Sequence, residues 1–95
     1  MHARVTKVSA DEDGLAQWRR IVRTEIAPNA AGKDGFVRAL WLLDRDSGHG
    51  LSVTLWDSRE SLENADAAAS ANRGKLASAT GGTVEHWYYE VVAEA

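Results

Sequence analysis

Residues 36–56, FVRALWLLDRDSGHGLSVTLW, contain the pattern that decides the fold. Between Phe36 and Asp44 both alternating sets of residues are apolar, which predicts a strand covered on both faces. The alternation places Phe36, Leu40 and Leu42 on one face and Val37, Ala39, Trp41 and Leu43 on the other. Residues 44–50 have the composition of a turn, and a second strand is predicted from Leu51 to Trp56. The short turn makes the pair an antiparallel hairpin.

A strand and a helix are predicted before the hairpin. Residues 3–8 alternate as a strand does, and apolar residues then recur at spacings of three and four, which is typical of an amphipathic helix. Ser9 and Glu12 have the spacing of a capping box at the start of this helix. Pro28 should end or kink the helix, with a loop after it.

A helix and a strand are predicted after the hairpin as well. Asp57 or Ser58 can cap this second helix, and residues 81–82, both glycine, close it. Its apolar stripe is mostly alanine and comprises Leu62, Ala65, Ala69, Asn72 and Leu76. Residues 83–92 form the last strand. The order β-α-β-β-α-β predicts a ferredoxin-like α+β fold, with a four-stranded antiparallel sheet and both helices on one of its faces.

Composition limits the classes of function. Ninety-five residues fit a single domain spanning residues 1–95, and the absence of cysteine excludes disulfides, thiolate nucleophiles and cysteine-based metal sites. Eleven basic residues against 14 acidic ones give a net charge of −3, which argues against a nucleic-acid partner. No apolar run is long enough to span a membrane, and the N-terminus lacks a signal-peptide core, so we expect a cytoplasmic protein. No spacing of its three histidines supports a metal site.

The hairpin also predicts a partner. Helices cover only one face of such a sheet, so the second apolar face of residues 36–44 would lie in water in a monomer. We therefore expect a homodimer in which the uncovered sheet faces pack together.

Four segments resemble the dimeric α/β-barrel superfamily, and within it the antibiotic-biosynthesis-monooxygenase-like (ABM) domain. They are Gly35-Phe36, residues 42–48 (LLDRDSG), residues 54–58 (TLWDS) and residues 89–92 (YEVV). The resemblance covers nearly the whole chain. It implies a dimeric α/β barrel and, in the oxygenases of the group, a pocket between sheet and helices. There, the anion of a polycyclic phenol or quinol reacts with dioxygen without a cofactor.

The same resemblance argues against heme degradation. The heme-degrading branch needs an asparagine on its first strand and a tryptophan and a histidine on its second helix. The two helix positions fall at about Ala65 and Lys75 here, and the first strand offers Arg4 and Thr6 but no asparagine.

Six residues are candidates for such a site. His86 lies among aromatic neighbours and is the candidate base, and Arg38, which interrupts an apolar strand, is the second candidate catalytic group. The expected substrate pocket comprises Trp18, Trp56, Asn72 and Thr54.

Structural roles compete with each assignment. His86 could be a hydrogen-bonded, half-buried residue. The tryptophans could serve only to pack the core and the dimer interface. Arg38 could pair with Glu85 or Glu90, and Asn72 could bond a backbone carbonyl. The sequence thus leaves two hypotheses: a cofactor-free monooxygenase acting on a flat aromatic phenol or quinol, with an open pocket, or a non-catalytic dimeric module that binds a small ligand or only itself.

Overall fold

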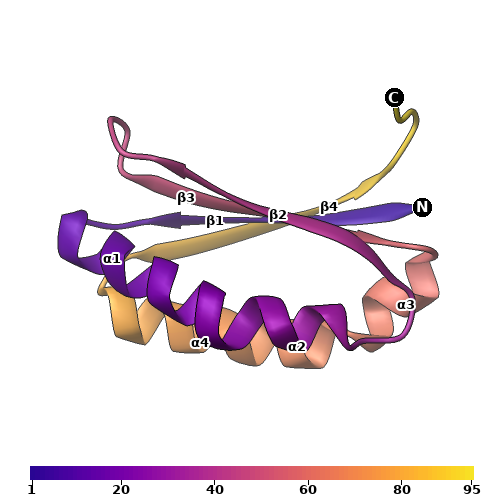
Figure 1. Ribbon diagram of the computed structural model, residues 1–95, viewed down its shortest axis with the longest axis horizontal. Coiled ribbons are helices and arrows are strands. Elements are labelled where there is room, and N and C mark those ends of the chain that lie inside the picture. Colours follow the sequence, from indigo (N-terminus) through magenta and orange to yellow (C-terminus); the bar gives the residue numbers. More distant parts are fainter.

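The computed structural model describes residues 1–95 as a four-stranded antiparallel sheet with every helix on one side (Figure 1). The strands lie in the order β2-β3-β1-β4, so the first and last strands of the chain pair with each other. Their bounds are His2–Ser9 for β1, Phe36–Asp44 for β2, His49–Trp56 for β3 and Thr83–Glu90 for β4. The predicted ferredoxin-like order is confirmed.

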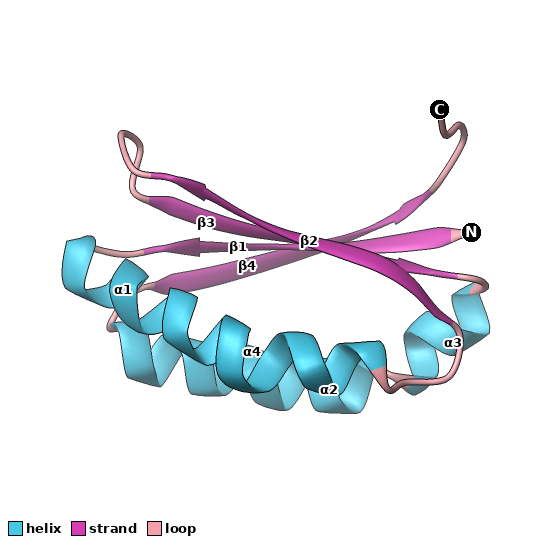
Figure 2. Ribbon diagram, viewed as in Figure 1, coloured by secondary structure: helices cyan, strands magenta, loops and turns pink.

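The first crossover is a continuous helical path that contains a π-helix. Helix α1 (Glu12–Ile21) passes into the π-helix Val22–Ile26 and then into α2 (Ala27–Ala31) (Figure 2). The helix therefore does not end at Pro28. The wider turns of the π-helix, closed by the bond from Ala27 N–H to the Val22 carbonyl, precede the proline and accommodate its ring and its missing N–H.

The start of α1 differs from the prediction. Asp11 is the N-cap, and its carboxylate accepts a hydrogen bond of 2.8 Å from the Gly14 amide. Ser9 is the last residue of β1, so the predicted capping box does not form. Gly14 is needed here because a Cβ atom would lie 2.5 Å from the Thr80 carbonyl oxygen, where α1 crosses the end of the last helix.

The second crossover is divided into two helices. Ser58 caps α3 (Arg59–Asn64) by accepting a hydrogen bond of 3.1 Å from the Ser61 amide. After Ala65 the chain continues as α4 (Asp66–Thr80), which ends at Gly81 in the left-handed conformation.

A β-bulge in β2 changes which side chains share a face. The register with β3 shifts between Phe36 and Arg38, so Val37 is an extra residue. Phe36 therefore packs edge-on against Trp56, with ring centroids 5.8 Å apart, on the same side as Ala39, Trp41 and Leu43. Its predicted place beside Leu40 and Leu42 is wrong, because the alternation resets at the bulge.

The two faces of the sheet have opposite surroundings (Figure 2). The covered face packs against the helices through two clusters, one around Val8, Trp18 and Leu76 and one around Trp56 and Leu62. The open face carries Arg38, Leu40 and Leu42 of β2, Leu51, Val53 and Leu55 of β3, Ala3, Val5 and Lys7 of β1, and Trp87 and Tyr89 of β4. On it, Leu40 is 46% and Leu42 47% exposed, which is high for leucine.

None of the helices combines the length and the apolar character needed to cross a bilayer. No three histidine, aspartate or glutamate side chains lie close enough together to hold a metal ion.

Candidate functional site

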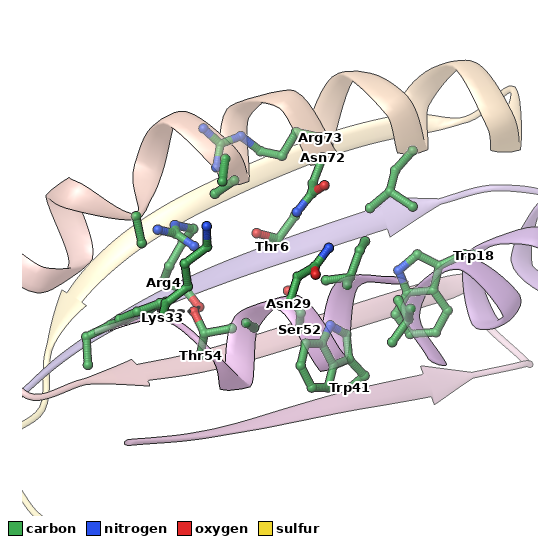
Figure 3. A pocket seen from close by; sticks show the side chains of 18 residues that line it. Arg4, Thr6, Trp18, Asn29, Lys33, Trp41, Ser52, Thr54, Asn72 and Arg73 are labelled. Atoms are coloured by element: carbon green, nitrogen blue, oxygen red, sulfur yellow. Dashed lines mark hydrogen bonds between the residues drawn. The ribbon is translucent and has the colours of Figure 1, made fainter. Parts of the chain in front are cut away.

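A cavity of about 330 Å³ lies between the covered face of the sheet and the helices. Small-molecule sites in proteins typically measure about 300–1,000 Å³, so the cavity has the size of a small-ligand site. Its lining is formed by Arg4, Thr6, Trp18, Val22, Ile26, Asn29, Ala30, Lys33, Trp41, Ser52, Thr54, Trp56, Ala65, Ala68, Ala69, Asn72, Arg73 and Leu76. Figure 3 shows that tryptophans Trp18 and Trp41 gather at one end and the cations Arg4 and Lys33 at the other.

The floor of the cavity is polar because of strand alternation. Arg4 and Thr6 of β1 lie beside Thr54 and Ser52 of β3, each pair being in register across the sheet. Alternate residues of a strand point to the same face, so all four side chains point toward the helices. Polar groups thus occupy the middle of a face whose two ends are apolar.

The roof of the cavity is made of small side chains. Ala65, Ala68 and Ala69 line it at the start of α4. Alanine at these positions leaves open the space that a larger apolar side chain would fill. The filled core that a purely structural module requires is therefore not present.

Arg4 dominates the cationic end. Its side chain is only 7% exposed, and its guanidinium lies 5.7 Å from the ring centre of Trp56. Its Nη2 donates a hydrogen bond of 3.3 Å to the Leu62 carbonyl, and its Nε lies 3.2 Å from Asp66 Oδ1. Burial lowers the pKa of Arg4, and the Asp66 carboxylate partly offsets this effect.

A second arginine shares the same carboxylate. Arg73 Nη1 lies 3.7 Å from Asp66 Oδ1, and the Tyr88 hydroxyl donates a hydrogen bond of 2.9 Å to that oxygen. One carboxylate oxygen thus faces two guanidinium groups and a phenol. Arg4 Nε and Arg73 Nη1 are both buried, and neither is aligned to form a hydrogen bond.

The tryptophans provide flat walls. Trp56 is almost completely buried, and its indole Nε1 donates a hydrogen bond of 3.0 Å to Thr54 Oγ1. Trp18 lies over Gly50, where a Cβ atom would come within 2.8 Å of the indole ring. Aromatic walls of this kind favour planar ligands.

Four of the six candidate residues meet at the cavity. Trp18, Thr54, Trp56 and Asn72 all line it. The side chain of Asn72 forms no hydrogen bond, so the backbone bond considered for it is not present and its amide is free to meet a ligand.

His86 and Arg38 lie outside the cavity. His86 is exposed on the edge strand β4, where its ring packs edge-on against Tyr88 at 5.4 Å. Arg38 is exposed on the open face, since the bulge places it opposite Leu55. It also cannot reach Glu85 or any other β4 residue, because β2 and β4 form opposite edges of the sheet.

Sequence reasoning missed the cations and several polar residues of the site. Arg4, Thr6 and Ser52 gave a usable signal, because they share strand faces with the buried Val8 and Trp56. Asn29 and Lys33 gave none, since the helix was not expected to continue past Pro28. The last missed cation, Arg73, follows Asn72 on α4 without any pattern that marks it.

The residues do not fit the heme-degrading machinery. Ala65 lines the cavity, whereas Lys75 is exposed and its Nζ lies 2.7 Å from Glu25 Oε2. No histidine lines the cavity, so no imidazole faces it as an iron ligand.

Comparison with known sequences gives a distant relationship. No family model matches the chain. An uncharacterized protein of Mycobacterium tuberculosis, Rv2557, is 28% identical over 89 residues, which make up 92% of this chain. The chain spans 40% of the length of that curated relative.

Solved structures give a closer match in shape. A Deinococcus radiodurans protein that has been assigned as an antibiotic biosynthesis monooxygenase has a TM-score of 0.82 at 22% identity. The match covers 100% of this chain and 95% of the other chain. The ActVA-Orf6 monooxygenase of Streptomyces coelicolor, in complex with nanaomycin D, has a TM-score of 0.79 at 14% identity, with 99% and 89% covered. SnoaB, a cofactor-independent oxygenase of Streptomyces nogalater, has a TM-score of 0.70 at 21% identity, with 98% and 94% covered. The chain therefore has the fold of the antibiotic biosynthesis monooxygenases.

Proposed function

We propose that the protein is a cofactor-independent oxygenase that acts on a flat aromatic phenol or quinol. The observation that carries the proposal is a cavity with tryptophan walls, a cationic end and no acidic residue in its lining. Such a cavity favours a planar molecule in its anionic form. Two proteins of the same fold support the reaction class, SnoaB as a cofactor-independent oxygenase and ActVA-Orf6 as a monooxygenase.

In this reaction the substrate supplies the electrons and dioxygen is the oxidant. Loss of the phenolic proton gives an anion whose charge is shared with a ring carbon. That carbon passes an electron to dioxygen, and the radical pair combines to form a C–O bond. The resulting peroxide takes up a proton, and cleavage of its O–O bond with loss of the remaining C–H proton releases water and leaves a carbonyl group. One CH₂ group and one O₂ thus give one C=O group and one water.

The protein contributes to the first step by stabilising the anion. Arg4 and Arg73, both largely buried, place positive charge at one end of the cavity, and this charge lowers the pKa of a phenol bound in the cavity. No histidine or carboxylate lines the cavity, so the phenolic proton leaves to solvent rather than to a lining base. Asn72, Thr6 and Ser52 are positioned to orient the ring oxygens by hydrogen bonds.

The proposed functional unit is a homodimer in which two copies pack their open faces together. The support is the exposed apolar surface formed by Leu40, Leu42, Trp87 and Tyr89. Contiguous surfaces of this kind are typical of protein interfaces.

Oxygen uptake with a panel of anthrones and dihydroxynaphthalenes tests the oxygenase. We expect uptake with at least one three-ring phenol and a fall in kcat/KM of at least tenfold, ~1.4 kcal/mol, in Asn72→Leu, which removes the polar amide but keeps the shape of the side chain. Asn64→Leu, on the exposed surface of α3, is the matched control and should retain wild-type turnover. Unchanged turnover in His86→Ala would exclude that histidine as the base.

The competing hypothesis is a ligand-binding module without turnover. The observation that favours it is the absence of a base in the lining. Quenching of tryptophan fluorescence by the same compounds, without oxygen uptake, would establish the module and exclude the oxygenase.

A further inference from the structure

The cavity holds more positive charge than a single phenolate can neutralise. Arg4, Arg73 and Lys33 line it, and Asp66 is the one carboxylate within ion-pair distance of the two arginines. Lys33 has no ion-pair partner. Three cations against one carboxylate leave two positive charges in excess at one end of the cavity.

The buried donors at that end are only partly used. A guanidinium carries five N–H donors, yet that of Arg4 is aligned for one hydrogen bond, to the Leu62 carbonyl. Arg4 Nε and Arg73 Nη1 are buried without a hydrogen-bond partner. Both atoms face Asp66 Oδ1, at 3.2 and 3.7 Å, so this carboxylate already pairs with them. Apart from the bond from Arg4 to Leu62, the two guanidinium groups make no hydrogen bond, and both arginines line the cavity. Their remaining N–H groups can therefore meet an acceptor that enters with the ligand.

We propose that the end of the cavity between Arg4 and Arg73 binds a carboxylate, so that the substrate is an aromatic acid as well as a phenol or quinol. This inference rests on the proposed function for the ring chemistry but not for the binding of the acid. A planar carboxylate matches the fork of donors on a guanidinium. Together with an ionised hydroxyl, it supplies the two negative charges that the site lacks.

The shape of the cavity gives such a ligand a single orientation. The cationic end and the Trp18–Trp41 end lie at opposite sides of the polar middle (Figure 3). A carboxylate at Arg4 places an attached ring toward the tryptophans and its hydroxyl beside Asn72. The reverse orientation would put the carboxylate against the indole rings of Trp18 and Trp41, away from the excess positive charge.

Equilibrium binding of a matched pair tests the subsite. The probes are 2-naphthoate and its methyl ester, which share the ring and differ in the charge. Isothermal titration calorimetry of the full chain should give at least tenfold tighter binding of 2-naphthoate, the size expected for one charge-assisted contact. Equal affinities for acid and ester, or no binding of either, would overturn the proposal.

Two variants locate the site. Arg73→Gln should remove the preference for the acid while leaving binding of the ester within twofold. Arg59→Gln is the matched control, because Arg59 is an exposed arginine on α3 that pairs with Glu63 away from the cavity. An acid preference that survives in Arg73→Gln and in Arg4→Lys would place the carboxylate elsewhere and refute the assignment.

The two proposals fail separately. The naphthoate probes carry no oxidisable hydroxyl, so their binding does not depend on turnover. Acid selectivity without oxygen uptake would retain the subsite and exclude the oxygenase. Oxygen uptake with a neutral quinol, without acid selectivity in binding, would retain the oxygenase and exclude the carboxylate subsite.

Discussion

The two faces of the sheet differ in a way that reverses the usual arrangement of a small domain. The covered face buries Arg4, Thr6 and Thr54 at its centre. The open face exposes Leu40 and Leu42 to solvent. In most domains the polar side chains of a sheet face water and the apolar ones face the core.

The difference indicates what each face meets. Buried polar groups are costly unless they bond something, and on the covered face they surround a cavity. Exposed apolar groups favour association, and on the open face they form a continuous surface. The covered face is therefore suited to a small ligand and the open face to a second protein chain.

The largest expected effect is on association through the open face. We expect Leu40→Glu to raise the dissociation constant of the homodimer at least ~100-fold, ~3 kcal/mol, because the interface would then bury two negative charges, one from each copy. Leu40 is half exposed in the protomer, so the fold itself should tolerate the change. Light scattering at micromolar concentration measures the mass.

Asp34→Glu, a conservative change at an exposed loop position, is the control and should leave the mass unchanged. A wild-type protein that is monomeric at that concentration would show that the open face does not bind a second copy of the chain.

A smaller effect is expected on the covered face, where packing is tight. Gly50→Ala should lower the free energy of unfolding by about 1–3 kcal/mol, since its Cβ atom would meet the Trp18 ring at 2.8 Å. Chemical denaturation followed by circular dichroism measures the change.

Gly74→Ala in α4 provides the opposite case. A Cβ atom there has no neighbour within 4 Å, so alanine should stabilise the helix by about 0.5–1 kcal/mol. Equal losses of unfolding free energy in Gly50→Ala and Gly74→Ala would mean that Trp18 packs less closely on Gly50 than the structure shows.

The smallest effect is expected at Asp44, an exposed polar group at the end of β2. Hydrogen bonds from Ser47 and Asp46 lower the pKa of its carboxyl group below the ordinary 3.8. The charged form is favoured in the folded state, so this contribution is present at neutral pH and is lost as the pH falls through the lowered pKa.

Asp44→Ala should therefore be slightly less stable than the wild type at neutral pH, and the difference should shrink on acidification. Urea midpoints measured over that pH range provide the test. A difference that grows as the pH falls would contradict the sign of the shift.

Much of the fold could be predicted because local patterns agree with each other. The strand Phe36–Asp44 has the predicted bounds, and the glycines after α4 close that helix as expected. The bulge at Val37 could not be predicted, since the sequence alternates smoothly through it and only pairing with β3 shows the extra residue. The helix that continues past Pro28 depends on a π-helix, which has no sequence signature in this segment.

The candidate site was predicted in part for similar reasons. Trp18 and Trp56 line the cavity, as their large aromatic side chains suggested. His86 was selected for its neighbours in the chain, but edge strand β4 leaves it in solvent. Arg4 was not selected, although it is the most buried cation of the site.

The sequence by itself determined the element order, the hairpin, the helix that carries the alanines and the surplus of apolar residues on a chain too small to bury them. These properties follow from periodicity and composition, which act over a few residues. Tertiary structure decided which face the helices cover, where Arg38 points and that Arg4 and Arg73 share Asp66. Those relations join residues far apart in the chain, and only the register of the strands and the packing of α4 bring them together.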